Sequence, residues 1–338
     1  MRPRRIVPTL TAVILTLVPR ADSIPVPALD LDRLAAQASI IAVGQITFVQ
    51  ELGKTTVQVG NRAVTAHTMS AELRADQLLK TPHGNAPPFL TFYFTLPDEF
   101  IGWRTVTPQS YGVFFLAESP SELKLASPYY PSLVAVPGGE VQEGTAIERV
   151  INQLRAVLES TTASVQVKRE AIFALSRTKN PAAIRALSGA VQLRDFTLRL
   201  SAAAALLEHD DLSALQLATD TLLRPDPTLP YNVLHNLSFA ISVGVRDERA
   251  IPSLSRLLHS SNAETRRAAA SALMHTGSNS AIDALLSALD DPDPMVRYYS
   301  VAGLAEITGQ ADWRPNIDDF TSDPNKYFKH WHEWSTAR

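Results

Sequence analysis

The chain has 338 residues, of which 45% are hydrophobic and 19% are charged, a balance typical of a folded protein. Its 31 basic and 34 acidic residues leave a formal net charge of -3. The protein therefore lacks the overall positive charge that would attract it to nucleic acids or anionic membranes. The chain contains no cysteine, so disulfides, thiolate catalysis, iron–sulfur clusters and covalently attached haem are excluded.

Residues 1–23 have the pattern of a secretory signal peptide. Arginines at positions 2, 4 and 5 precede an apolar run from Ile6 to Val18 that is too short to span a bilayer comfortably, and Ala21 and Ser23 suit cleavage after position 23. We therefore expect an exported protein, periplasmic or extracellular in a bacterial envelope, with no integral membrane span in the mature chain. A short uncleaved anchor is the alternative.

Residues 29–137 alternate mostly with period two, which predicts strands that are half-buried on one face. In residues 68–76, for example, Met69, Ala71 and Leu73 share one side, and polar residues share the other. A short helix is expected over 31–39. The other predicted strands cover 40–49, 89–95 and 111–116, and about five strands in a segment of this size favour a small barrel or sandwich.

The order of these elements resembles the OB-type or netrin-like barrel of bacterial exported proteins. The matching pieces are a short helix, a strand like IIAVGQI, a long strand ending in LLK and a strand containing YGVFFLAE. The resemblance covers 29–137 and implies a small β-barrel domain. Animal relatives of that fold inhibit metalloproteinases through an amino-terminal cysteine, which this chain lacks.

A helical repeat begins after the glycine-rich stretch VPGGEVQEG, residues 136–144. From residue 146 onward, helix pairs recur at spacings of 31, 35, 32 and 31 residues. Two positions of the first helix mark the repeat: Val167, Leu198, Val233, Thr265 and Val296, and then Leu175, Leu206, Ile241, Leu273 and Leu304. Because one pair cannot bury its apolar face alone, the pairs are expected to stack into a solenoid.

The segments NAETRRAAASALMHTG and DPMVRYYSVAGLAEITG resemble HEAT repeats of the phycobilisome-lyase HEAT-like type. The resemblance covers 145–312 and implies a protein-binding scaffold; a few members of that group attach bilin chromophores. The predicted fold is therefore a two-domain α+β chain: a small OB/netrin-like β-barrel over 29–137, followed by a HEAT-like α-solenoid over 145–312. Residues 313–338 are expected to form a capping helix whose aromatic residues cover the last repeat, with His330 and His332 at its wet edge.

Basic residues recur at one position of the repeat, and we interpret them as a solvated face or as partners of aspartates. They are Lys168, Arg199, Arg266 and Arg297. The acidic run 290–294 lacks the ligand spacing of a calcium loop, so Asp293 is expected to start the helix that begins at Pro294.

Two segments partly match known catalytic or metal-binding motifs, but each lacks a required residue at the required spacing. Gly53-Lys54-Thr55 resembles the end of a phosphate-binding loop, but position 48 is phenylalanine, and a hairpin turn is expected there instead. His332-Glu333 would start a zinc-protease motif, but residue 336 is threonine. The remaining histidines are interpreted as solvated or core-edge residues: His67, His83, His209, His235, His259 and His275. We therefore predict no catalytic residue, no metal site and no cofactor.

The leading functional hypothesis is a non-catalytic scaffold or adaptor that binds a protein or peptide, and no nucleic acid, on the solenoid surface. Helical phase places the contacts on the second helices of the pairs, at Arg185, Ser188, Gln192, Ser253, Arg256, Asp283 and Ser287. One alternative is an envelope enzyme with a site at the interface between barrel and solenoid. The other is a barrel that regulates a protease.

Overall fold

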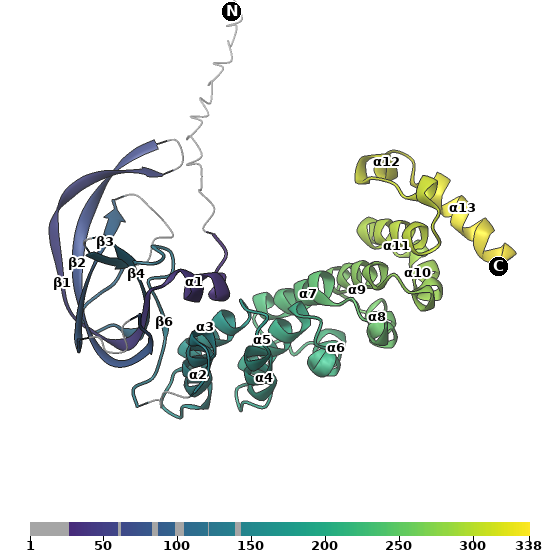
Figure 1. Ribbon diagram of the computed structural model, residues 1–338. Coiled ribbons are helices and arrows are strands. Elements are labelled where there is room, and N and C mark those ends of the chain that lie inside the picture. Colours follow the sequence, from purple (N-terminus) through teal and green to yellow (C-terminus); the bar gives the residue numbers. More distant parts are fainter. Residues whose placement is uncertain (1–26, 60–61, 83–86, 99–104, 121, 139–142) are drawn as a thin grey trace, which may run out of the picture.

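The computed structural model describes residues 27–59, 62–82, 87–98, 105–120, 122–138 and 143–338. The predicted signal peptide, residues 1–23, lies outside the described residues. The first part of the described chain is a sheet with one short helix, and the rest is a row of helix pairs (Figure 1). The predicted order, strands first and helical repeats second, is confirmed.

The strands pair in a circuit that returns to its starting strand. β1 (Ile40–Val59) pairs with β2 (Arg62–Lys80), β2 with β3 (Phe89–Pro97), β3 with β5 (Glu122–Leu125), and β5 with β4 (Tyr111–Ser119). β4 then pairs with β1 through residues 111–116. β6 (Ser132–Val134), at the end of the strand order, pairs with residues 112–114 of β4, next to the part of β4 that pairs with β5. The helix α1 (Leu31–Gln37) precedes β1.

The predicted hairpin turn at Gly53-Lys54-Thr55 is wrong. These residues lie inside β1, opposite Thr68, His67 and Ala66 of β2. A register irregularity between Glu51 and Gly53 lets the two strands continue past this point as a long arm. Sequence reasoning took the glycine for a turn because a bulge and a turn both favour it.

Residues 40–44 of β1 and 112–116 of β4 are buried on both faces, which explains their uninterrupted apolar runs. Ile40, Ala42 and Ile46 join Phe92 and Phe114 in the core inside the sheet. The intervening side chains point the other way and pack on the helices; they are Ile41, Val43, Val113 and Phe115, all 0% exposed. The sheet and the solenoid therefore share one apolar core.

The solenoid consists of two rows of helices. The first helices of the pairs form one row, and α12 and the sheet lie toward that side in Figure 1. The first row is α3 (Val165–Leu175), α5 (Phe196–Glu208), α7 (Tyr231–Gly244), α9 (Ala263–Thr276) and α11 (Pro294–Ile307). The second row is α2 (Ala146–Glu159), α4 (Pro181–Ala190), α6 (Leu215–Leu223), α8 (Ile251–Leu257) and α10 (Ile282–Ser287). None of the described helices is long and apolar enough to cross a bilayer.

The repeat alignment is confirmed by burial. The second marker position is 0% exposed in every pair: Leu175, Leu206, Ile241, Leu273 and Leu304. The predicted helix start at Asp293 is confirmed, because its side chain accepts hydrogen bonds from the backbone N–H groups of Met295 and Val296. Asn180 and Asn262 accept similar hydrogen bonds in the first turns of α4 and α9.

The recurring basic residues are structural. Each one donates to a backbone carbonyl at the end of the preceding helix or in the linker after it: Lys168 to Leu158, Arg199 to Val191, Arg266 to Ser260 and Arg297 to Asp291. Such bonds satisfy carbonyl groups that a helix end leaves without partners. Arg266 also forms a two-pronged ion pair with Asp291, with Nε–Oδ2 at 2.8 Å and Nη2–Oδ1 at 3.1 Å.

Arg266→Met should lower the free energy of unfolding by about 3 kcal/mol, because it leaves the Asp291 carboxylate buried without a cation. The two side chains are only 12% and 9% exposed. Urea unfolding of the variant would measure the loss, and Arg266→Met/Asp291→Asn should recover part of it. Arg256→Ala is the matched control, since it breaks an exposed pair with Asp220 and should cost less than about 1 kcal/mol. Equal losses in both variants would contradict the structural role of Arg266.

Polar contacts join the sheet to the solenoid next to the shared core. The Arg149 guanidinium of α2 donates to the Leu79 carbonyl at 3.1 Å, and the Gln153 amide donates to Gln77 at 2.8 Å. The Leu31 N–H of α1 donates to the Arg177 carbonyl at the end of α3, also at 3.1 Å. The first repeat is thereby held against the sheet.

The carboxyl-terminal segment contains two helices where one was predicted. These are α12 (Ile317–Ser322) and α13 (Pro324–Ala337), and Asp323 accepts from Lys326 N at the start of α13. Trp331 is 0% exposed and Tyr327 is 6% exposed against the last repeat. His332 is exposed, as predicted. His330 is half-buried instead of solvent-exposed. Its ring stacks on the Trp313 ring with 3.7 Å between the ring centres, because the turn Ala311–Trp313 packs against α13.

Candidate functional site

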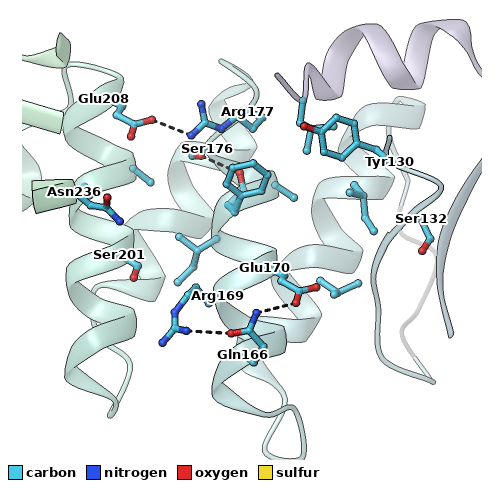
Figure 2. A pocket seen from close by; sticks show the side chains of 18 of the residues that line it. Tyr130, Ser132, Gln166, Arg169, Glu170, Ser176, Arg177, Ser201, Glu208 and Asn236 are labelled. Carbon is cyan, nitrogen blue, oxygen red and sulfur yellow. Dashed lines mark hydrogen bonds and ion pairs between the residues drawn. The ribbon is translucent and has the colours of Figure 1, made fainter. Parts of the chain in front are cut away.

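A cavity of about 680 Å³ lies where the sheet meets the first repeats. Its lining comes from the segment around β6 on one side, from α3 in the middle, and from α5 and α7 on the other side (Figure 2). Tyr130 and Ser132 mark the sheet side, and Ser201 and Asn236 mark the far side. The cavity therefore runs across the first row of helices.

The shape of the cavity follows from one repeat position, two residues before the second marker leucine or isoleucine. In three successive repeats this position holds Phe173, Ala204 and Phe239, and all three line the cavity. Phe173 is 45% exposed and Phe239 is 53% exposed, whereas Ala204 is 7% exposed. The small Ala204 side chain of α5 lies between the large Phe173 and Phe239 side chains of the two neighbouring helices, and this arrangement leaves a slot over α5.

Polar side chains on α3 are held in place beside Phe173. The Gln166 amide donates to Glu170 at 3.0 Å and accepts from Arg169 at 3.1 Å. Arg177 lies 4.9 Å from the centre of the Phe173 ring, and its Nη2 is 3.5 Å from Glu208 of α5. Figure 2 shows these pairs along the cavity. Two arginines and two glutamates leave its lining without a net charge.

The Asn236 side chain of α7 is available for further hydrogen bonds. Its side chain is exposed and has no hydrogen-bond partner among the described residues. An amide group offers both donors and an acceptor, and this one lies at the cavity between Val233 and Phe239. It can bond to the backbone of a bound chain without any change in the protein.

The exposed ridge of α7 continues the surface away from the cavity. Tyr231 is 69% exposed, but its hydroxyl donates to Glu264 at 3.1 Å and its ring stacks on His235. His235 Nδ1 bonds to the other oxygen of Glu264, and the Glu264 carboxylate raises the pKa of Tyr231. An aromatic side chain held in this way loses less entropy when a partner covers it.

The seven predicted contact residues lie elsewhere, on or next to α4, α8 and α10, and none of them lines the cavity. Several have partners inside the chain: Arg256 bonds to Asp220, Asp283 to Arg338, and the Ser188 and Ser287 hydroxyls to carbonyls of their own helices. Binding by these residues stays a prediction. By contrast, the exposed large apolar residues of the described helix pairs all lie on first helices: Val165, Phe173, Phe196, Tyr231, Phe239 and Val243.

Sequence reasoning missed this face although it carried a signal. Phe173 and Phe239 occupy a position two residues off the buried stripe, where an exposed repeat helix normally carries a polar or small residue. Large aromatic residues that recur out of phase with the buried period indicate a binding surface.

The cavity lies where the enzyme hypothesis placed a site. Among the described lining residues there is no histidine or aspartate, and the Ser176 hydroxyl donates to the Phe173 carbonyl of its own helix. Burial, with Asp76 beside it, raises the pKa of Tyr111 to about 12, so this lining residue stays protonated. A serine nucleophile needs a neighbouring base; the lining carboxylates, Glu170 and Glu208, contact Gln166 and Arg177 instead of a described lining serine.

Within the described ranges, no group of three or more histidine, aspartate or glutamate side chains is arranged to hold a metal ion. His83 lies outside these ranges. His67 was expected to be a solvated or core-edge residue, but it is clamped between two carboxylates: Nδ1 is 2.6 Å from Glu51 and Nε2 is 2.6 Å from Asp98. Both contacts together require the doubly protonated ring, because a neutral imidazole has one N–H. The bond to Glu51, with help from Asp98, raises the pKa of His67.

This clamp should make stability depend on pH through His67. A pKa raised above the unfolded value of about 6.5 contributes stability that is complete below that value and is lost as the pH rises through the folded pKa. Lys54, directly opposite His67 on β1, adds a cation on the same arm. Urea unfolding of the wild type and His67→Gln should show a stability difference that is largest below about pH 6.5 and shrinks as the pH rises above that value. A difference that stays constant or grows would contradict the clamp.

Comparisons with known proteins agree on the helical part of the chain. A model of HEAT repeats matches residues 224–305, so the solenoid is HEAT-like, as the resemblance implied. No curated protein matches the sequence. One similar solved structure is the complex of CpcE and CpcF of phycocyanin lyase from Nostoc sp. PCC7120, which is 21% identical, with 54% of this chain and 72% of that chain covered and a TM-score of 0.38.

Two further solved structures are similar over comparable lengths. A designed armadillo repeat protein is 18% identical, with 48% of this chain and 84% of that chain covered and a TM-score of 0.34. Human deoxyhypusine hydroxylase in complex with glycerol is 20% identical, with 56% and 74% covered and a TM-score of 0.26. At these values the likeness says nothing about activity.

Proposed function

We propose that the protein is a non-catalytic scaffold that binds a protein partner on its first row of helices, with a segment of the partner in the cavity between the sheet and α7. The observation that carries the proposal is the exposure of Phe173 and Phe239 on both sides of Ala204 at one repeat position. Aromatic residues around a concavity, with a polar rim, are the features that distinguish protein-binding surfaces. The second-row residues are the rival surface.

The two surfaces are distinguished by site-specific photo-crosslinking in a cell-envelope extract of the source organism. A benzophenone side chain would replace Phe173 or Phe239 on the first row, and Gln192 or Ser287 on the second row. We expect the same partner to be crosslinked from both first-row positions and from neither second-row position. Crosslinking from Gln192 and Ser287 alone would move the binding surface to the predicted second-row residues and overturn the proposal.

We also propose that the strand circuit is a closed barrel of the OB or netrin-like type, and that the protein is exported. The pairing of β1 with both β2 and β4 supports the first point. The basic residues at positions 2, 4 and 5, followed by a short apolar run, support the second. Mass spectrometry of the protein from its own cells should find a mature chain that begins at Ile24.

A further inference from the structure

We infer that the segment bound in the cavity is an extended chain of low charge, which adds a strand to β6 and places one large apolar side chain in the slot over Ala204. The inference rests on the proposed function and specifies its partner. It comes from three features: a strand edge in the cavity wall, a slot of fixed width, and free amide capacity at the far side.

The sheet-side wall of the cavity contains an edge strand. β6 stands at the end of the strand order and, among the described strands, pairs only with β4, through Ser132, Leu133 and Val134. The same three residues line the cavity, together with Tyr130 and Pro131. An edge strand has backbone donors and acceptors without a ladder partner, and an extended peptide can pair with them.

The slot over α5 fits one side chain of such a peptide. Neighbouring helices pack about 8–10 Å apart, so Phe173 on α3 and Phe239 on α7 are separated by roughly 20 Å, with Ala204 between them. An extended chain rises about 3.3 Å per residue and crosses this span in about six residues. A helix that crossed the row in the same direction, about 10 Å across, would rest on the two phenylalanines, and its internally bonded backbone would leave the β6 edge unpaired.

The polar groups around the slot suit a peptide backbone. Asn236 can donate to a carbonyl and accept from an N–H of the crossing chain, since it has no partner among the described residues. The charges of Arg169, Arg177, Glu170 and Glu208 balance, and Arg177 and Glu208 already form an ion pair. A strongly charged segment would therefore gain little here, whereas an apolar one would gain burial between the two rings.

The test is selection of a phage-displayed library of random peptides, each about ten residues long, on the full chain. We expect the selected peptides to have apolar residues at alternate positions, including one large side chain. N-methylation of alternate backbone amides in a synthetic copy should weaken its binding at least tenfold, because it removes donors to β6. Ala204→Leu, which fills the slot without removing any contact residue, should also weaken binding at least tenfold. Gln192→Ala on the second row should leave binding unchanged.

Other results separate the inference from the proposed function. Selected peptides whose apolar residues have helical spacing, or peptides whose binding N-methylation does not affect, would overturn the inference of an extended chain. If Ala204→Leu still blocked the binding of such peptides, the proposed binding surface on the first row would stand. The inference would also be overturned if selection on the wild type enriched no peptide more strongly than selection on the Ala204→Leu variant. Peptides that bind Ala204→Leu and Phe239→Ala as well as the wild type would count against both claims. If Ala204→Leu lowers the melting temperature, Asn236→Ala, a change at an exposed residue, replaces it and should weaken binding severalfold.

Discussion

Trp331→Ala should lower the free energy of unfolding by about 4 kcal/mol, the range for a fully buried tryptophan. Trp331 is 0% exposed, contacts Trp334 edge to face, and belongs to the same core as the last repeats. An open solenoid end leaves apolar surface in water, so α13 stabilises the whole row through this residue. Urea unfolding followed by circular dichroism would measure the change.

Trp331→Phe is the matched control. The Trp331 indole Nε1 is buried and has no acceptor among the described residues, so phenylalanine removes an unsatisfied donor together with some volume, and the two effects partly offset each other. We expect Trp331→Phe to cost less than half as much as Trp331→Ala. His332→Ala, at an exposed position on the same helix, should be nearly neutral. A loss below about 1 kcal/mol for Trp331→Ala would show that α13 does not cap the solenoid.

Residues 29–137 should not fold when they are produced without the solenoid. The separation would open the apolar cluster in which Ile41, Val43, Val113 and Phe115 are fully buried, because α2 and α3, which contact β2 and β6, would be lost and only α1 would remain. Full exposure of the four side chains would cost about 8 kcal/mol at roughly 2 kcal/mol for each, so even a partial opening removes a large part of the stability of an ordinary domain. Near-ultraviolet circular dichroism should show no fixed tertiary structure.

A longer piece tests the same point in the opposite direction. Residues 27–190 retain α2, α3 and α4, and with them the partners of the four side chains, so this piece should unfold cooperatively. If 29–137 alone were soluble and unfolded in one sharp transition, the shared core would not be needed, and the two parts would be independent domains as the sequence boundary implied.

The repeat could be predicted from sequence because burial imposes a period. Leu175 and its four equivalents lie in the same environment in each pair, and that environment accepts only apolar residues of similar size. The strands buried on both faces were also predicted as strands, but the contact between sheet and solenoid was not predicted. Alternation shows which residues share a face and does not show what covers each face.

The site was harder to predict because its parts come from distant segments. Phe173, Ala204 and Phe239 form a slot only after α3, α5 and α7 stack, and β6 joins them from a different part of the chain. His67 likewise meets Glu51 across the arm and Asp98 after β3. Helical phase placed five of the seven second-row residues at exposed positions, with Ser188 and Ser253 half-buried, but exposure alone does not distinguish a binding surface from a solvated one.

The most direct measurement is a binding titration with the partner that the first-row crosslinks identify. Phe173→Ala/Phe239→Ala should weaken binding at least tenfold, about 1.4 kcal/mol or more, while the melting temperature stays near that of the wild type because both side chains are exposed. Arg185→Ala/Arg256→Ala should change the affinity less than twofold. Unchanged affinity in the phenylalanine variant, with a large loss in the arginine variant, would contradict binding on the first row of helices.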